Sequence, residues 1–315
     1  MLKLILQRLA MALFTLLTVC ILVFSITEAL PGDVCTAYLG RDAQGTRLEN
    51  CRQARHLDQP ALQRFANWGG GVLQGSLGTS LKRDKPINEL VATRMRNTAV
   101  LALGAAMIGI PLAIFLGVIA ALRRDRPADV LISGGAIFAM TIPEFVTATL
   151  LVLIFSIQLQ WFPAVTTVRH NAPITELLPN IVLPMITLAL VMMAHILRMV
   201  RSAMIDVIAS DFIQMARLKG VPFWRIVCLH ALPSAMLPTI NIIALTVAWL
   251  LGGAVIIEQV FNYPGIGTLM IRAIYDRDLP LVQAIALILA TVYVLCNLLA
   301  DLSSLALNPR LRTAR

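Results

Sequence analysis

Long apolar runs, separated by short clusters of charge, dominate the sequence. A bilayer core about 30 Å thick is crossed by an α-helix of about 20 apolar residues. A run of that length without Asp, Glu, Lys or Arg therefore predicts one membrane-spanning helix. Four runs meet this criterion: Leu9–Thr27, Thr98–Leu122, Ala235–Ile257 and Leu281–Ala300.

Two further apolar segments complete the pattern. Val130–Leu159 is too long for one span and contains Glu144 directly after Pro143, whereas Ile181–Leu197 is interrupted only by a proline and a histidine. The sequence therefore predicts six spans and an all-α, polytopic integral membrane protein.

A carboxylate at membrane depth costs at least about 2.5 to 3.5 kcal/mol and faces protein or water. We interpret Glu144 as a structural acid near the end of a long third helix that starts in the cytoplasm, and the alternative is a solute-pathway or proton-relay group.

The composition supports the membrane class. With 58% hydrophobic and 14% charged residues, the chain has more apolar side chain than a soluble domain of its size can bury. The first span follows Lys3 and Arg8, as the core of a signal peptide would. Its apolar part exceeds roughly 15 residues and no small-x-small cleavage site follows, so we expect it to remain as a helix.

Basic residues in the short loops predict the orientation. With a cytoplasmic N-terminus, half of the 26 Lys and Arg residues lie on each side, so the total does not decide. Most of the outer half belong to one segment, Pro31–Arg96, and loops beyond roughly 60 residues are translocated largely regardless of charge. The short loops then place both termini in the cytoplasm. The net charge of +9 is assigned to inner loops that meet anionic lipid and a cytoplasmic partner, because no aromatic-interleaved basic patch indicates nucleic acid.

Small residues recur at helical spacing in the second span. Residues four apart share one face, and small side chains there let another helix backbone approach closely, where no hydrophobic effect drives helices together. Whether this packing is within the chain or with a second subunit stays open. The repeat comprises Ala105, Gly109, Ala113, Gly117 and Ala121, and a shorter one in the fifth span comprises Ala244, Ala248 and Gly252.

Cysteine and histidine positions indicate no metal site or catalytic cluster. Cys35 and Cys51 lie in the same long outer segment. If that segment faces an oxidising space, a disulfide between them is reasonable, and the alternative is that two cysteines occur in one loop by chance. No CxxC or Cys/His spacing is typical of a metal site. The histidines, at positions 56, 170, 195 and 230, are too scattered for an integral membrane enzyme.

The stretch Gln214–Ile226, QMARLKGVPFWRI, interrupts the apolar pattern with charge. Asp211 can cap a helix with Gln214 three residues later, and Gly220 supplies the left-handed residue that ends it. Pro222 suits the first turn of a second helix, so two short helices are predicted to meet at a glycine corner. Exposed apolar side chains ringed by charge are typical of a protein interface, and an interfacial helix lying on lipid is the alternative.

This stretch resembles the EAA loop of ABC importer permeases. The runs ARLKG and HALPSAMLP are similar to the dipeptide, oligopeptide and nickel branch of that family. Four positions of the general pattern are kept and three are replaced. The kept residues are Ala216, Gly220, Leu232 and Pro233, and the replacements are Gln214, Met215 and His230.

Other stretches resemble the same branch in the same order, so the resemblance covers nearly the whole chain. They are LPGD at residues 30–33, GGVLQGSLGTSL at 70–81, FNYPGIG at 261–267, RDLPLVQ at 277–283 and NP at 308–309.

The resemblance implies that the glycine corner is a coupling helix, which docks into a cytoplasmic ATPase subunit and transmits its closure to the spans. It also implies a second homologous permease, two ATPase subunits and an extracytoplasmic solute-binding protein as partners. The chain has no GxxxxGK[ST] phosphate loop, so we expect no enzymatic activity and no cofactor on it. The implied coupling residues are Gln214, Met215, Ala216, Arg217, Leu218, Lys219, Gly220, Trp224 and Arg225.

The outer segments would form the outer gate and contact the binding protein, chiefly through Tyr263, Pro264, Gly265 and Gly267. The expected divisions are residues 1–30 with the first span, an extracytoplasmic loop 31–96, a core 97–306 and a cytoplasmic tail 307–315. The coupling loop, residues 210–237, belongs to the core. The expected location is the bacterial cytoplasmic membrane.

The predicted function is therefore the permease subunit of an ATP-driven importer for peptides or a similar small solute. A self-sufficient secondary transporter or channel is the alternative, but the spans offer few of the paired ionisable groups that it needs. Within the family, the solute stays open among dipeptides, oligopeptides, nickel chelates, opines, glutathione and sugars.

Overall fold

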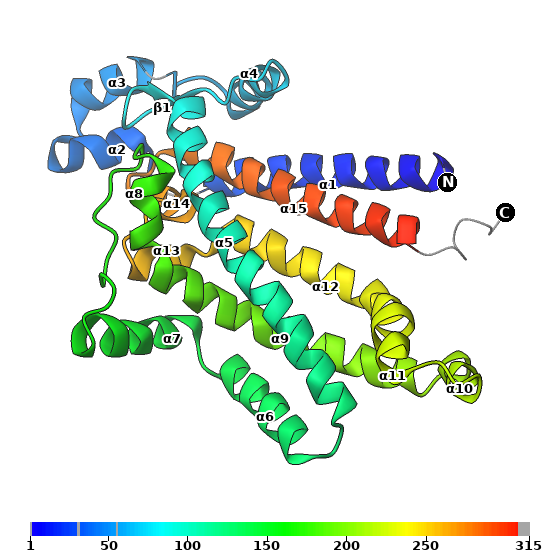
Figure 1. The fold of residues 1–315 in the computed structure, drawn as a ribbon. Helices are drawn as coiled ribbons and strands as arrows, with labels where there is room; N and C mark the ends of the chain where they lie inside the picture. Colours follow the sequence, from blue (N-terminus) through cyan, green and yellow to red (C-terminus); the bar gives the residue numbers. More distant parts are fainter. Residues whose placement is uncertain (1, 30–31, 55, 308–315) are drawn as a thin grey trace.

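The computed structural model describes residues 2–29, 32–54 and 56–307 as an α-helical bundle with one small β-hairpin. Within these residues, five helices are long and apolar enough to cross a membrane. Figure 1 shows them packed into one bundle, with the start of the first and the end of the last at the same end. They are α1 (Leu2–Ala29), α5 (Ile87–Leu122), α9 (Val182–Ile208), the helix that includes α12 (Leu232–Gly253), and α15 (Leu279–Leu307).

The third predicted span is broken into two helices, α6 (Pro127–Thr141) and α7 (Glu144–Leu151), bent by 104°. The break follows from Pro143, whose ring disfavours helical backbone at the residue before it, and that residue is extended. A π-helical segment, η2 (Val152–Gln158), continues α7. The prediction of one long third helix ending near Glu144 is wrong, because Glu144 begins the second helix. The described chain has up to six spans if the bent pair counts as one.

The contact between α5 and α9 forms the centre of the bundle. Ala105 and Ala113 of the small-residue repeat are fully buried. A Cβ atom on Gly117 would lie 2.8 Å from the Cβ of Val200 and 2.9 Å from the carbonyl oxygen of Leu197. The repeat therefore packs against another helix of the same chain, which answers the question that the sequence left open.

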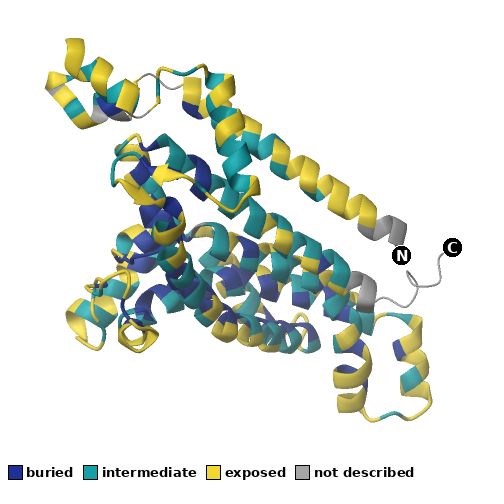
Figure 2. Ribbon diagram, turned by 90° about the horizontal axis from the view of Figure 1, so that it is seen from above, coloured by how far each residue is buried: buried dark blue, intermediate teal, exposed yellow. Residues whose placement is uncertain are grey.

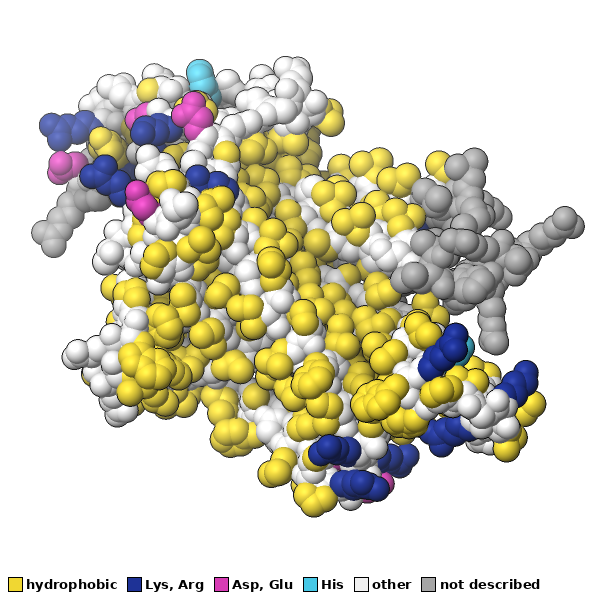
Figure 3. Space-filling view, viewed as in Figure 1, with side chains coloured by type: hydrophobic (Ala, Val, Ile, Leu, Met, Phe, Trp, Pro, Cys, Tyr) yellow, Lys and Arg dark blue, Asp and Glu magenta, His cyan; other side chains and the backbone are white. Residues whose placement is uncertain are grey.

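By contrast, α1 packs on α15 and leaves most of its length uncovered. Figure 2 shows this helix, which starts at the N label, as mostly exposed, with half-buried residues towards its end. Most of its exposed side chains are apolar, and Figure 3 shows hydrophobic side chains over the flank of the bundle with charges towards its ends. That distribution is the one expected of a bundle surrounded by lipid.

Short elements gather at the end of the bundle opposite the first residues of α1 (Figure 1), and we call this end the disulfide face. Cys35 and Cys51 are joined there by a disulfide. The elements before the second span are α2 (Val34–Leu39), η1 (Gly40–Asp42), α3 (Gly45–Ala54), α4 (Ala61–Leu73) and the antiparallel strands β1 (Thr79–Ser80) and β2 (Lys85–Pro86). The later ones are α8 (Ile174–Leu177), η3 (Leu178–Asn180), α13 (Val255–Val260) and α14 (Ile266–Tyr275).

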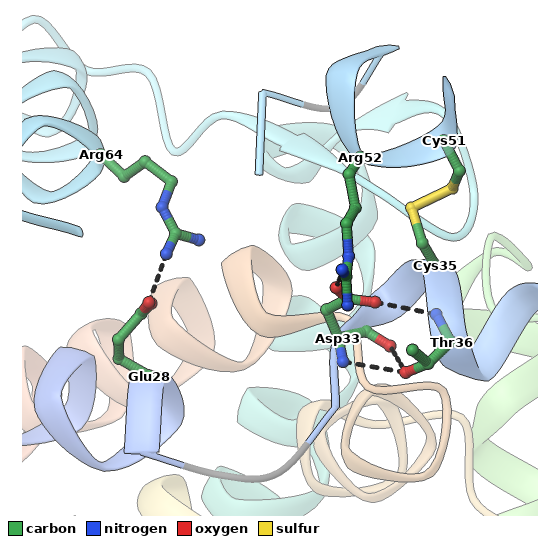
Figure 4. A network of polar contacts seen from close by, with 7 residues as sticks. All are labelled: Glu28, Asp33, Cys35, Thr36, Cys51, Arg52 and Arg64. Carbon is green, nitrogen blue, oxygen red and sulfur yellow. Dashed lines mark hydrogen bonds and ion pairs between the residues drawn. A yellow bond between two sulfur atoms is a disulfide. The ribbon is translucent and has the colours of Figure 1, made fainter. Parts of the chain in front are cut away.

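Two carboxylates hold these short elements together. Asp33 caps α2 by accepting from the Thr36 backbone at 2.8 Å and pairs with Arg52 of α3 at 2.7 Å (Figure 4). Burial raises the pKa of Asp33, but the hydrogen bonds from Thr36 and Arg52 outweigh it and hold the pKa below its ordinary value. Asp278, fully buried, accepts from the Ser80 hydroxyl and so fixes the hairpin to the turn between α14 and α15.

Replacing Gly117 with alanine should destabilise the bundle. The added methyl group has no room between α5 and α9, and overpacking of this kind costs about 1 to 3 kcal/mol. Gly134→Ala is the matched control, because the added group meets nothing within 4 Å on α6. Thermal unfolding in detergent should show a lower midpoint for Gly117→Ala only, and equal midpoints for the two variants would contradict the packing described.

Candidate functional site

A basic elbow projects from the bundle at the end where α1 begins (Figure 1). Its first arm is α10 (Asp211–Leu218), and its second is α11 (Phe223–Arg225). Ser210, not Asp211, occupies the position before the first helical residue, and neither side chain caps the helix. The predicted cap at Asp211 is therefore wrong, because Asp211 is already the first helical residue. The Ser210 hydroxyl is not free to cap, because it donates back to the carbonyl of Val207.

Gly220 makes the corner of the elbow. Its φ of +73° is left-handed, as the sequence predicted. The Gly220 N–H donates to the carbonyl of Arg217 at 2.9 Å, and the Val221 N–H donates to that of Ala216 at 3.2 Å. These two bonds form a Schellman motif, which satisfies the last carbonyl groups of α10 and fixes the direction in which the chain leaves it.

The second arm is not a separate short helix, contrary to the prediction. After α11 the chain continues through a π-helical segment, η4 (Ile226–Ala231), directly into α12. Pro222 immediately precedes the first helical residue. The elbow is thus a rigid extension of the fifth span, and α10 joins it to the end of α9.

The inner side of the elbow is anchored and its outer side is free. Ile213 of α10 is fully buried, and Ile226 and Val227 are buried beneath the corner. On the outer side, Leu218 is 82% exposed and Trp224 is 68% exposed. Figure 3 shows hydrophobic side chains there among dark blue basic ones. The exposed residues include Gln214, Met215, Arg217, Lys219, Gly220 and Arg225, whereas Ala216 is half-buried.

A partly buried ion pair braces the same end of the bundle. Arg201 of α9 donates from Nε and Nη2 to the two carboxylate oxygens of Asp129 in α6, both at 2.6 Å. Asp129 also accepts from Ser133 at 2.9 Å. The pair joins the broken third span to α9. The sequence alone does not reveal this pair, because the two residues lie 72 positions apart.

The four residues expected at the outer gate lie at the disulfide face, and all four are buried within the chain. The Tyr263 hydroxyl donates to the carbonyl of Asn97 at 2.7 Å, and the Asn97 side chain donates to the carbonyl of Pro264 at 2.9 Å. Burial, and then the carboxylate of Glu258, raise the pKa of Tyr263, so its hydroxyl keeps the proton that it donates. This loop is therefore fastened to the start of the second span.

Glu258 is the centre of this buried cluster. Its carboxylate accepts from the Thr98 hydroxyl at 2.6 Å and from the Thr268 N–H, in the first turn of α14, at 2.9 Å. A Cβ atom on Gly265 would collide with this carboxylate, and one on Gly267 would lie 3.0 Å from it. Both glycines are thus required for the acid to reach the helix terminus.

Glu258 was not among the residues predicted to be functional, because it comes directly after the fifth apolar run, which ends at Ile257. An acid at the very end of a span, followed by two glycines, was the available signal. Within the described residues, no group of three or more His, Cys, Asp or Glu side chains could hold a metal ion.

Comparison with known proteins assigns the chain to a family. Residues 113–313 match the family described as the binding-protein-dependent transport system inner membrane component, and residues 1–102 match the N-terminal component of the same systems. The chain belongs to this permease family. It is therefore a multi-pass inner-membrane permease subunit of an ABC importer, and in such systems the ATPase and the binding protein are separate components. The alternative of a self-sufficient transporter or channel is replaced by this assignment.

Relatives resemble this permease along its full length. A protein of Brucella abortus named as a peptide transport system permease is 36% identical over 99% of both chains. Glutathione transport system permease proteins of Escherichia coli and Salmonella typhimurium are 32% and 34% identical, also over 99% of both chains.

A solved structure shows that the fold is shared. In the inward-facing MetNI methionine ABC transporter, one chain matches this permease with a TM-score of 0.59 at 16% identity. The match covers 70% of this chain and 96% of that one. At this level of identity the likeness concerns the fold alone.

Gly265→Ala should strongly destabilise the permease, because the new methyl group occupies the space of the Glu258 carboxylate. Glu258→Ala alone should also destabilise it, since the hydroxyl and N–H groups that donate to the acid lose their acceptor. The double variant should lose about 1 to 3 kcal/mol less than the sum of the two single losses, because the collision is absent. Unfolding midpoints of the four proteins in detergent measure this coupling.

Gly70→Ala, at the same face but with nothing within 4 Å, is the control and should behave as wild type. Additive losses in the double variant would show that the glycine does not make room for the acid.

Proposed function

We propose that this permease imports peptides or peptide-like solutes such as glutathione, driven by ATP hydrolysis on separate subunits. The support is the full-length similarity to permeases named for peptide and glutathione transport. The complete importer would contain a second homologous permease, two ATPase subunits and an extracytoplasmic solute-binding protein. The solute crosses between the two permeases, and this chain catalyses no reaction.

The elbow is the proposed docking surface for an ATPase subunit, which places it and both termini in the cytoplasm. The observation that carries this proposal is the combination of a fixed corner with a free outer surface. The Schellman motif at Gly220 and the buried Ile213 hold the elbow in one shape. Leu218 and Trp224 meanwhile stand out from it, and well-packed apolar anchors ringed by charge dominate the energy of many interfaces.

Movement of the ATPase would be transmitted to the other side of the membrane by packed helices. The elbow connects α9 to α12, and α9 packs along α5. The far end of α5 carries Asn97 and Thr98, which hold the loop around Tyr263 and Glu258. A displacement at the elbow is thus coupled to the proposed outer gate at Tyr263, Pro264, Gly265 and Gly267 by packed side chains rather than by a flexible loop.

Leu218→Asp should weaken binding of the ATPase subunit by roughly tenfold or more, because it places a charge at the centre of the apolar surface. Folding should not change, since the Leu218 side chain is almost fully exposed. The measurement is co-purification and affinity of the ATPase subunit for the permease in detergent. Leu73→Asp is the control, because Leu73 at the disulfide face is also highly exposed. Unchanged affinity in Leu218→Asp would refute docking at the elbow.

Two substitutions at Gly220 separate backbone strain from bulk. A Cβ atom there meets nothing within 4 Å, so alanine adds only the cost of a left-handed backbone, about 1 to 2 kcal/mol. Leucine adds bulk at the exposed corner of the elbow, where the docked partner would lie. ATP-driven uptake should fall modestly in Gly220→Ala and be nearly lost in Gly220→Leu, with equal membrane insertion of both. Full uptake by a well-expressed Gly220→Leu permease would remove the role given to this corner.

Substitutions of the charges at the rim should have smaller effects. Arg217→Ala and Lys219→Ala each remove an exposed cation, and such charges mainly tune the rate of association.

A further inference from the structure

Two adjoining cavities lie between α1 and α4 at the disulfide face. One has a volume of about 410 Å³ and a partly polar lining that includes Glu28, Arg64 and Trp68. The other, of about 600 Å³, is almost wholly apolar and is lined by residues such as Ile21 and Leu62. Phe24 and Glu28 line both cavities, so together they form one groove with a polar and an apolar part.

The groove lies at the level where hydrocarbon gives way to headgroups. Its α1 side consists of the last turns of the first span, which ends at Ala29. Its α4 side carries aromatic rings: Phe65 packs edge-on against Phe24 at 4.9 Å between centroids, and Trp68 follows at 6.1 Å. Aromatic side chains of this kind are enriched at the membrane–water interface.

The polar part contains donors that lack an acceptor. Arg64 pairs through one terminal nitrogen with Glu28, as Figure 4 shows. The Nε of Arg64 and the Nε1 of Trp68 are buried and have no hydrogen-bond partner among the residues that the structure describes. A buried donor without a partner is costly, so two such donors in one cavity indicate a ligand that carries an acceptor there.

We propose that the groove binds a zwitterionic phospholipid. The phosphate accepts from Arg64 Nε and Trp68 Nε1, the ammonium group lies beside Glu28, and an acyl chain occupies the apolar part beside Ile21 and Leu62. One cation and one anion in the same cavity complement a zwitterionic headgroup, whereas a headgroup with net negative charge would be repelled by Glu28. A small polar solute would leave the apolar part empty. The proposal does not depend on which solute is transported.

The test is lipid retention by the whole importer. The complex is reconstituted in nanodiscs of equal parts phosphatidylethanolamine and phosphatidylglycerol and then extracted in detergent. Native mass spectrometry identifies the lipid that stays bound from the added mass. Wild type should retain a phosphatidylethanolamine molecule through washing. The Arg64→Lys, Trp68→Phe double variant keeps a cation for Glu28 and a ring for Phe65 but removes both unpaired donors. Its retention should fall roughly tenfold.

Trp161→Phe is the control for the loss of an indole, because Trp161 lies outside both cavities. It should retain lipid as wild type does. Equal retention by the double variant and the control would overturn the proposal, as would the absence of retained lipid from wild type.

A second measurement needs no change in the site. A variant that keeps Trp68 and has phenylalanine at the other three tryptophans is reconstituted with brominated phosphatidylethanolamine or brominated phosphatidylglycerol as a minor component. Quenching of Trp68 should be several-fold stronger with the ethanolamine lipid. Equal quenching by both lipids, or none because a segment of another subunit fills the groove, would overturn the proposal.

Discussion

The close approach of α5 and α9 is the contact on which the other helices depend. Inside a membrane no hydrophobic effect draws helices together, so their association relies on van der Waals contact over a matched surface. The alanine and glycine face of α5 provides that surface against Val200 and Leu197. Each end of this pair then organises its surroundings: α9 leads into the elbow and holds Asp129, and α5 presents Asn97 and Thr98 to the loop at the disulfide face.

At both ends of this helix pair, buried carboxylates are satisfied by hydrogen bonds, as a surrounding of low dielectric constant requires. A buried carboxylate is costly unless every oxygen finds a donor, and both Glu258 and Asp129 accept from two or more groups. In each case the acid joins a short or broken helix to a long one. Removing such an acid would detach the short or broken helix from the long one, rather than only lower the stability of the contact.

The sequence predicted those features that depend on local composition. Charge-free runs located the long spans, and the glycine rule located the corner at Gly220. The second span was predicted to begin at Thr98, whereas α5 begins at Ile87. The charged residues Arg94 and Arg96 excluded the first turns of this helix from an uncharged run. Arg96 is accommodated there because it donates to the carbonyl of Ala172 at 2.6 Å, a partner that no local pattern reveals. The cluster around Glu258 could not be predicted from local sequence either, because its partner Thr98 lies 160 residues away.

The π-helical segment η4 has a consequence for how such permeases can diverge. A π-turn holds one residue more than an α-turn, so η4 contains an insertion relative to a regular helix. One residue corresponds to about 100° of rotation about the helix axis. The wider turn absorbs that residue locally, so the elbow and α12 keep the faces that an uninterrupted helix would give them. A one-residue deletion in the regular part of α12 would instead turn the rest of its seam away from its neighbours, while changes of similar size in the loops of the disulfide face leave the bundle register intact.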